Sequence, residues 1–151
     1  MTTTAARINP AEETIPVGPL TIRFLLTGEN SSGSVAAFEL TVPASEGLPA
    51  PPHSHAAYEE TIYGIDGTIV WTVEGQSIEV GPGEALCIPR GAVHQFRNAG
   101  TGDAKALCMI IPAVIGPQYF REVSSVLAAG GPPDRAKLVE IMRRHGLEPA
   151  R

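Results

Sequence analysis

Short apolar segments separated by glycine- and proline-containing turns run through most of this chain, and they constrain its fold more than any other feature. The segments lie at residues 20–26, 35–42, 58–65, 68–73, 77–80, 85–88, 93–97 and 106–111. Many short strands with frequent turn signals, such as Asp66-Gly67, are typical of a β-sandwich or a barrel. Because no helical stretch separates these segments, the pattern argues against an α/β fold.

The two ends of the chain differ from this β-rich middle. Residues 1–16 are polar and predict an N-terminal arm, either loose or docked. Residues 17–115 then form the predicted barrel, and residues 116–151 form a helical tail. The chain is therefore expected to hold one compact domain with two appendages, as its length of 151 residues also suggests.

Two short helices are expected in the tail. Apolar side chains recur at helical spacing over residues 117–128, and the glycines and prolines of residues 130–133 end that helix. Asp134 is a favourable N-cap for a second helix. Gly146, followed by the apolar Leu147, is a typical C-terminal stop.

Composition excludes several classes of partner. The net charge of −5 argues against nucleic acid, because a phosphate-binding surface needs clustered cations. No apolar stretch reaches transmembrane length, so no membrane partner is expected. The N-terminus lacks the apolar region of a signal peptide, which predicts a cytoplasmic protein. Cys87 and Cys108 lie in apolar segments and are expected to be buried free thiols, with a disulfide as the alternative.

Three of the four histidines and one glutamate form a pattern that could carry chemistry. His53 and His55 are two positions apart, so in a strand both rings lie on one face. Glu60 and His94 follow in later segments. Imidazoles and a carboxylate that converge suit a divalent transition metal, although a His-x-His pair alone is a weak signal. His145, in the tail, is expected on the surface.

The spacing around these residues resembles the two sequence motifs of the cupin superfamily. The first motif is Gly, five residues, His-x-His, three or four residues, Glu, six residues and Gly, matched here by Gly47, His53, His55, Glu60 and Gly67. The second is Gly, five residues, Pro-x-Gly, two residues, His, three residues and Asn, matched by Gly83, Pro89, Gly91, His94 and Asn98. The resemblance covers residues 35–112.

This resemblance implies an all-β fold, a double-stranded β-helix or jelly-roll barrel with the two short helices after it. It also implies one divalent metal ion (Fe, Mn, Co, Ni or Zn) with His53, His55, Glu60 and His94 as ligands. Glu59 is the rival carboxylate because the family tolerates either spacing, and Glu60 is favoured because it alone leaves six residues before the motif glycine. Asn98 is expected to be structural.

Alternation along the strands predicts a mainly apolar pocket beside the metal. Its candidate lining residues are Phe38, Leu40, Ile62, Phe96, Cys108 and Ile110, all of which are equally compatible with barrel core. Such a pocket favours a small organic substrate, aromatic compounds included, over a highly charged one.

Three functions remain open, because fold does not determine function. Similarity to the small quercetinase-like cupins favours a metal-dependent dioxygenase that acts on an enolic or aromatic compound with O2, with Glu60 as the catalytic base. The alternative is a lyase, isomerase or cyclase that uses the ion as a Lewis acid. A non-enzymatic binding module is the third. A homodimer is expected, since an N-terminal edge strand would otherwise lie unpaired.

Overall fold

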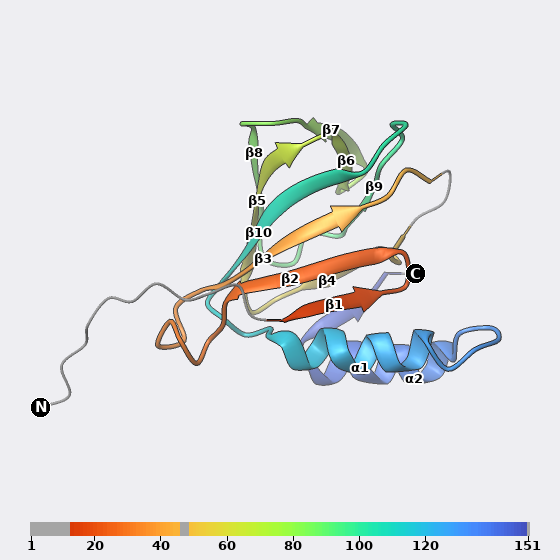
Figure 1. The fold of residues 1–151 in the computed structure, drawn as a ribbon. Coiled ribbons are helices and arrows are strands. Elements are labelled where there is room, and N and C mark those ends of the chain that lie inside the picture. The colour runs from red at the N-terminus through yellow and green to blue at the C-terminus, as the bar shows by residue number, and fades with distance from the viewer. Residues whose placement is uncertain (1–12, 46–48, 151) are drawn as a thin grey trace, which may run out of the picture.

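Two antiparallel sheets face each other in the computed structural model, which describes residues 13–45 and 49–150 (Figure 1). In the described residues, the larger sheet has the spatial order β1 (Thr14–Val17), β2 (Leu20–Leu26), β3 (Ala36–Val42), β10 (Ala104–Ile111), β5 (Glu59–Asp66) and β8 (Ala85–Ile88). The smaller has the order β11 (Leu147–Pro149), β4 (His53–His55), β9 (His94–Arg97), β6 (Ile69–Val73) and β7 (Gln76–Val80). This arrangement confirms the predicted all-β jelly roll.

The side chains between the sheets form the hydrophobic core. Phe24 and Phe38 are cross-strand partners on β2 and β3, and their ring centroids lie 5.3 Å apart. Phe120 packs against both rings, at centroid distances of 5.7 and 5.2 Å. Tilted and edge-to-face pairs of this kind contribute about 0.5–1.5 kcal/mol each beyond the area they bury. The tail is therefore joined to the barrel through its core.

The two predicted tail helices are present as α1 (Pro117–Leu127) and α2 (Arg135–Arg144). Asp134 caps α2, since its side chain accepts a hydrogen bond from the backbone N–H of Lys137 at 3.1 Å. Gly146 adopts a φ of +84° after α2, which is the left-handed conformation that favours glycine. Figure 1 shows the helices side by side, next to β1.

The sequence pattern missed two strands. β1 pairs with β2, and it spans the predicted boundary between the arm and the barrel at residue 16. β11 pairs with β4 within the predicted helical tail, after the expected end of its second helix at Gly146. Both strands are short and contain a proline, a residue that argues against a strand when the sequence alone is considered. The rest of the predicted arm, residues 1–12, lies outside the described residues, as does the motif residue Gly47.

Two expectations about single residues were wrong. Cys87 is exposed because it lies on the outward face of the edge strand β8, whereas Cys108 is buried as expected, and both thiols are free. His145 is only 20% exposed at the side chain, because it packs between the helices. Among the described residues, the helices are too short or too polar to cross a bilayer.

Candidate metal centre

Three histidines meet between two neighbouring strands of the smaller sheet. β4 carries His53 and His55, and its antiparallel pairing with β9 places His53 directly opposite His94. One ring nitrogen from each histidine lies within 4.8 Å of the others. His55 and His94 are 2% and 1% exposed. The structure thus brings together the three histidines that the sequence pattern singled out.

Backbone carbonyls determine which nitrogen of each ring carries the proton. The Nδ1 atoms of His53, His55 and His94 lie 3.0, 3.0 and 2.9 Å from the carbonyl oxygens of Pro51, Tyr58 and Ala92. A carbonyl oxygen can only accept, so each Nδ1 must be the donor. Each Nε2 of a neutral ring is then left with a bare lone pair. This is the tautomer that a metal-binding histidine needs.

Glu60 projects into the same space from the other sheet. Its Oε2 atom lies 3.4 Å from Nε2 of His55 and 3.2 Å from Nε2 of His94. Its side chain is 12% exposed. Glu59 instead points outward and forms an ion pair with Arg90 at 2.9 Å. Of the two rival carboxylates, Glu60 is therefore the one that faces the histidines.

The lone pairs of this cluster face one another. A carboxylate oxygen and two unprotonated Nε2 atoms are all acceptors, so their close approach is repulsive unless a cation lies between them. In agreement, Nε2 of His94 is one of two buried side-chain polar atoms without a hydrogen-bond partner among the described residues, the other being Nε1 of Trp71. The donor set of three imidazoles and one carboxylate fits a divalent transition metal.

The pKa values of Glu60, His94 and His53 are shifted because these side chains lie close together. Burial alone would raise the pKa of Glu60, but when a proton rather than a metal ion occupies Nε2, hydrogen bonds from His55 and His94, followed by positive charge on His94 and His53, outweigh burial and lower the pKa to about 2. Burial alone would lower the pKa of His94, yet Glu60 raises it. Burial, together with neighbouring His94, lowers the pKa of His53. Glu60 is therefore an anion at neutral pH, which is the form that binds a cation.

Tyr58 supports the cluster from behind. Its ring stacks on that of His55 with centroids 3.9 Å apart and an interplanar angle of 14°. It is 1% exposed, and burial followed by the nearby Glu60 charge raises its pKa, so the phenol stays neutral. The stacked ring fixes the orientation of His55. Tyr58 is not one of the positions in the two cupin motifs, so the sequence pattern did not predict that it supports His55.

A cavity of about 190 Å³ opens beside the cluster and includes His53, Glu60 and His94 in its lining. Four of the predicted pocket residues line it: Phe38, Leu40, Phe96 and Ile110. Ile62 and Cys108 do not, which corrects that part of the prediction. They are cross-strand partners on β5 and β10 and are 0% exposed, so they belong to the packed core.

The sequence pattern also missed part of the cavity wall. Trp71 and Tyr58 line it from the barrel, and further apolar side chains line it from α1 and α2. The helical spacing of the tail showed that these helices have an apolar face, but it could not show what that face covers. Asn98 has the expected structural role, because its Nδ2 donates to the carbonyls of Val42 and Gly102, each at 2.8 Å.

Comparison with protein families agrees with this architecture. The family profile described as "Cupin domain" matches residues 39–110, a stretch that contains the three histidines and Glu60. Many solved structures share the fold, and two of them match with a TM-score of 0.58. KdgF from Halomonas sp. is 16% identical and covers 67% of this chain and 86% of its own. A predicted oxalate decarboxylase from Thermotoga maritima is 22% identical and covers 72% and 99%.

Two of the curated relatives that match by sequence each cover 64% of this chain. Quercetin 2,3-dioxygenase from Bacillus subtilis is 31% identical in an alignment of 105 positions that covers 64% of this chain and 31% of the relative. The tetracenomycin polyketide synthase protein TcmJ from Streptomyces glaucescens is 29% identical over 96 residues, which are 64% of each protein. The chain thus spans about a third of the first relative and less than two thirds of the second.

Proposed function

This chain belongs to the cupin superfamily, and from that premise we propose that it is a metal-dependent enzyme, specifically a dioxygenase that acts on a small enolic or aromatic compound. The observation that carries the proposal is that hydrogen-bond acceptor atoms of two histidines and Glu60 face one another without a donor between them. Nε2 of His55 and of His94 lie within 3.4 Å of the same Glu60 oxygen, at the wall of a cavity. A metal ion held between these atoms turns their repulsion into attraction.

In this proposal His53, His55, Glu60 and His94 hold one divalent ion of Fe, Mn, Co or Ni. When bound, such an ion would supply Lewis acidity and one-electron chemistry toward O2. The chain's own residues prepare the site for it. The carbonyls of Pro51, Tyr58 and Ala92 hold the rings in the tautomer that exposes Nε2.

Glu60 has a second role in this proposal. Its carboxylate faces the cavity, so a Glu60 oxygen that is not held by the ion would accept the proton of a substrate enol or phenol. The apolar side chains around it, Phe96 and Ile110 among them, exclude water from the substrate. Electron density on the deprotonated substrate would then rise, as attack by O2 requires.

A lyase, isomerase or cyclase is the second candidate, in which the ion acts only as a Lewis acid and zinc would also serve. The similarity to a protein of a polyketide synthase favours it. The two candidates differ in oxygen consumption. Only a dioxygenase takes up O2 in proportion to the substrate that disappears.

The deciding experiment begins with protein purified without chelator or metal-affinity tag. Elemental analysis should find about one transition-metal ion per chain. His94→Ala should lose most of it, while His145→Ala, which removes the histidine between the helices, should retain it. Oxygen uptake with catechol then separates the candidates. Equal metal content in both variants would contradict the proposed site, and turnover without O2 uptake would favour the Lewis-acid alternative.

A further inference from the structure

The helical tail closes one side of the barrel. α1 packs against β1, which is an edge of the larger sheet, and α2 packs against β11, which is an edge of the smaller sheet. Because α1 and α2 also contact each other, the helix pair bridges the two sheets where their edges would otherwise be open. Figure 1 shows this pair alongside β1.

The inner face of the helix pair lines the same cavity as the candidate metal centre. Tyr119, Phe120 and Val123 line it from α1, and Leu138 and Met142 line it from α2. His53, Glu60 and His94 line it from the barrel. A molecule held at the cluster therefore contacts the helices as well.

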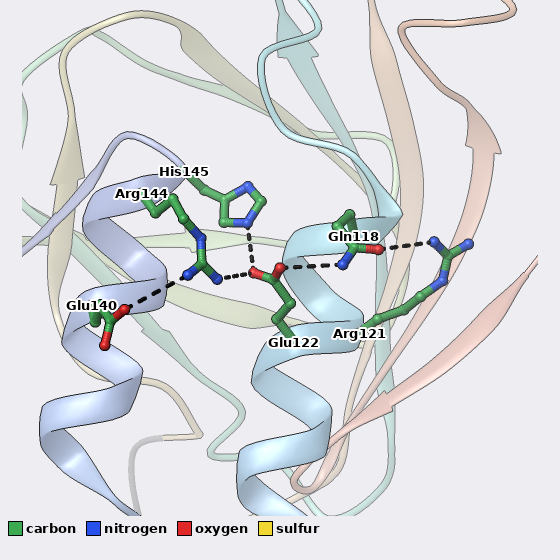
Figure 2. Close-up of polar contacts among 6 residues, drawn as sticks. All are labelled: Gln118, Arg121, Glu122, Glu140, Arg144 and His145. Atoms are coloured by element: carbon green, nitrogen blue, oxygen red, sulfur yellow. Dashed lines mark hydrogen bonds and ion pairs between the residues drawn. The ribbon is translucent and has the colours of Figure 1, made fainter.

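Polar contacts hold the helix pair in one position. Figure 2 shows Glu122 of α1 facing Arg144 and His145 at the end of α2. Its Oε2 atom lies 2.7 Å from both Nη2 of Arg144 and Nε2 of His145. β11 then pairs with the histidine-bearing strand β4, in the register Leu147 to His55 and Pro149 to His53. The tail is thus coupled directly to the strand that carries two of the histidines.

The helix pair lies outside the part of the chain that the family profile matches, which ends at residue 110. The three histidines and Glu60 lie within the matched segment. α1 and α2, which follow that segment, supply the side of the cavity that would face the rest of the substrate. Selectivity among substrates is set by the side chains that surround the reacting group. In this chain the helices supply a large share of those side chains.

The chemistry of the cavity restricts what it can hold. Away from His53, Glu60 and His94, its lining is made almost entirely of apolar and aromatic side chains, and no Lys or Arg of the described residues lines it. A charged group on the body of a ligand would lose its hydration without gaining a partner. The volume is about 190 Å³, and an engineered apolar cavity of about 150 Å³ holds one benzene molecule.

We propose that α1 and α2 form the specificity wall of this site and restrict it to compounds of about one aromatic ring whose body is uncharged. This inference rests on the proposed function in one respect, namely that one end of the ligand binds a metal ion at the histidine cluster. The remainder of the ligand is selected by the apolar side chains of the helices, foremost Val123 and Leu138.

Two related probes test the charge requirement. Catechol and 3,4-dihydroxybenzoate share the two hydroxyls that chelate a metal, but the second carries a carboxylate on the opposite side of the ring. Trp71, the only tryptophan of the chain, lines the cavity, so its fluorescence should report binding to the metal-loaded protein. Catechol should bind about tenfold more tightly or better, because the distal carboxylate has no cationic partner. Equal affinities would overturn the proposal.

Matched variants test the wall. Val123→Phe and Leu138→Phe each narrow the cavity from a different helix, whereas Arg135→Phe adds the same ring at an exposed position of α2. Catechol affinity should fall about tenfold in the first two, because inserted bulk costs roughly 1–3 kcal/mol where there is no room. It should be unchanged in the third. Metal content by elemental analysis should be the same in all three, and catechol binding that is unaltered in both wall variants would refute the role of the helices.

The same variants separate this inference from the proposed function. If the protein retains no metal, the proposed function fails, and phenol binding to the metal-free protein then tests the wall by the same Trp71 fluorescence. Phenol should bind the wild type and Arg135→Phe and should be excluded from Val123→Phe and Leu138→Phe. If phenol does not bind the wild type, or binds all variants equally, the helices do not limit what the cavity holds. This conclusion stands whether or not the protein binds a metal.

Discussion

At the scale of single residues, the site depends on which carboxylate of the Glu59-Glu60 pair faces inward. The two differ by one position on β5, so their side chains lie on opposite faces of the sheet. Glu60 meets His55 and His94, and Glu59 meets Arg90 at the surface. The pair therefore offers a matched test of the ligand set.

Glu60→Gln should lower metal affinity about tenfold or more, since even outer-shell partners of a metal ligand contribute 10–100-fold. The amide keeps the size of the side chain but loses the negative charge. Glu59→Gln should leave metal affinity unchanged, because it removes only a surface ion pair. Titration of the apoprotein with Mn²⁺ or Zn²⁺ measures both. A loss of similar size in the two variants would mean that Glu60 is not a ligand.

Gly64 is a second residue with a specific structural requirement. A Cβ atom at this position would lie 2.0 Å from the carbonyl oxygen of Gly81. The reason is that Gly64 exchanges backbone hydrogen bonds with the turn before β8, accepting from Gly83 at 3.0 Å and donating to Glu84 at 2.9 Å. The barrel wall and this turn touch without room for a side chain.

Gly64→Ala should therefore lower the free energy of unfolding by about 3 kcal/mol or more, the upper end for overpacking. Gly75→Ala is the control, since its Cβ would meet open space although its φ is +80°. It should cost only about 1–2 kcal/mol, the strain of a left-handed residue. Urea denaturation of both variants measures the difference. Similar losses in the two would show that the turn can move away from β5.

At the scale of elements, the tail helices depend on one carboxylate. Glu122 accepts hydrogen bonds from Arg144, His145 and Gln118, and in that order these bonds lower its pKa to about 2 from an ordinary value of 4.5 (Figure 2). Because the folded-state pKa lies below the unfolded one, the contribution to stability is complete above pH 4.5 and is lost as the pH falls toward 2.

Accordingly, the melting temperature of the wild type should exceed that of Glu122→Gln near neutral pH, and the gap should close as the pH falls from 4.5 toward 2. Glu140→Gln is the control, because that side chain is 74% exposed and its contact with Arg144 is 3.8 Å long. Its effect should be small at every pH. Thermal denaturation followed by circular dichroism at a series of pH values makes the comparison, and a gap that stays constant with pH would contradict the role given to Glu122.

At the scale of the whole molecule, the expected homodimer stays a prediction, and the structure suggests where it could form. Tyr63 and Ile65 on β5 and Ile111 at the end of β10 are 44%, 41% and 45% exposed. Tyr63 and Ile65 are two positions apart on β5 and lie together on its outward face, whereas Ile111 pairs with Glu59 and lies toward the other end of the same face. Grouped exposed apolar residues often mark an interface.

Light scattering after size exclusion should give about twice the chain mass of 15.9 kDa. Tyr63→Lys should shift the protein toward the monomer, because it places a charge in the apolar group. A substitution at exposed Glu79 of β7, such as Glu79→Gln, should leave the mass unchanged. A wild-type protein that is monomeric at all concentrations would remove the dimer from consideration.

Alternation of apolar residues and turn glycines predicted a β-sandwich or barrel, because these signals act within one strand or one turn. The jelly roll and the set of His53, His55, Glu60 and His94 followed from the resemblance to the two cupin motifs. Tertiary structure alone decided the rest. The stacking of Tyr58, the carbonyls that fix the tautomers, the pairing of β11 with β4 and the helical wall of the cavity all join segments far apart in the chain. Local patterns show which face of an element is apolar, but the partner of that face is determined only when the whole chain packs.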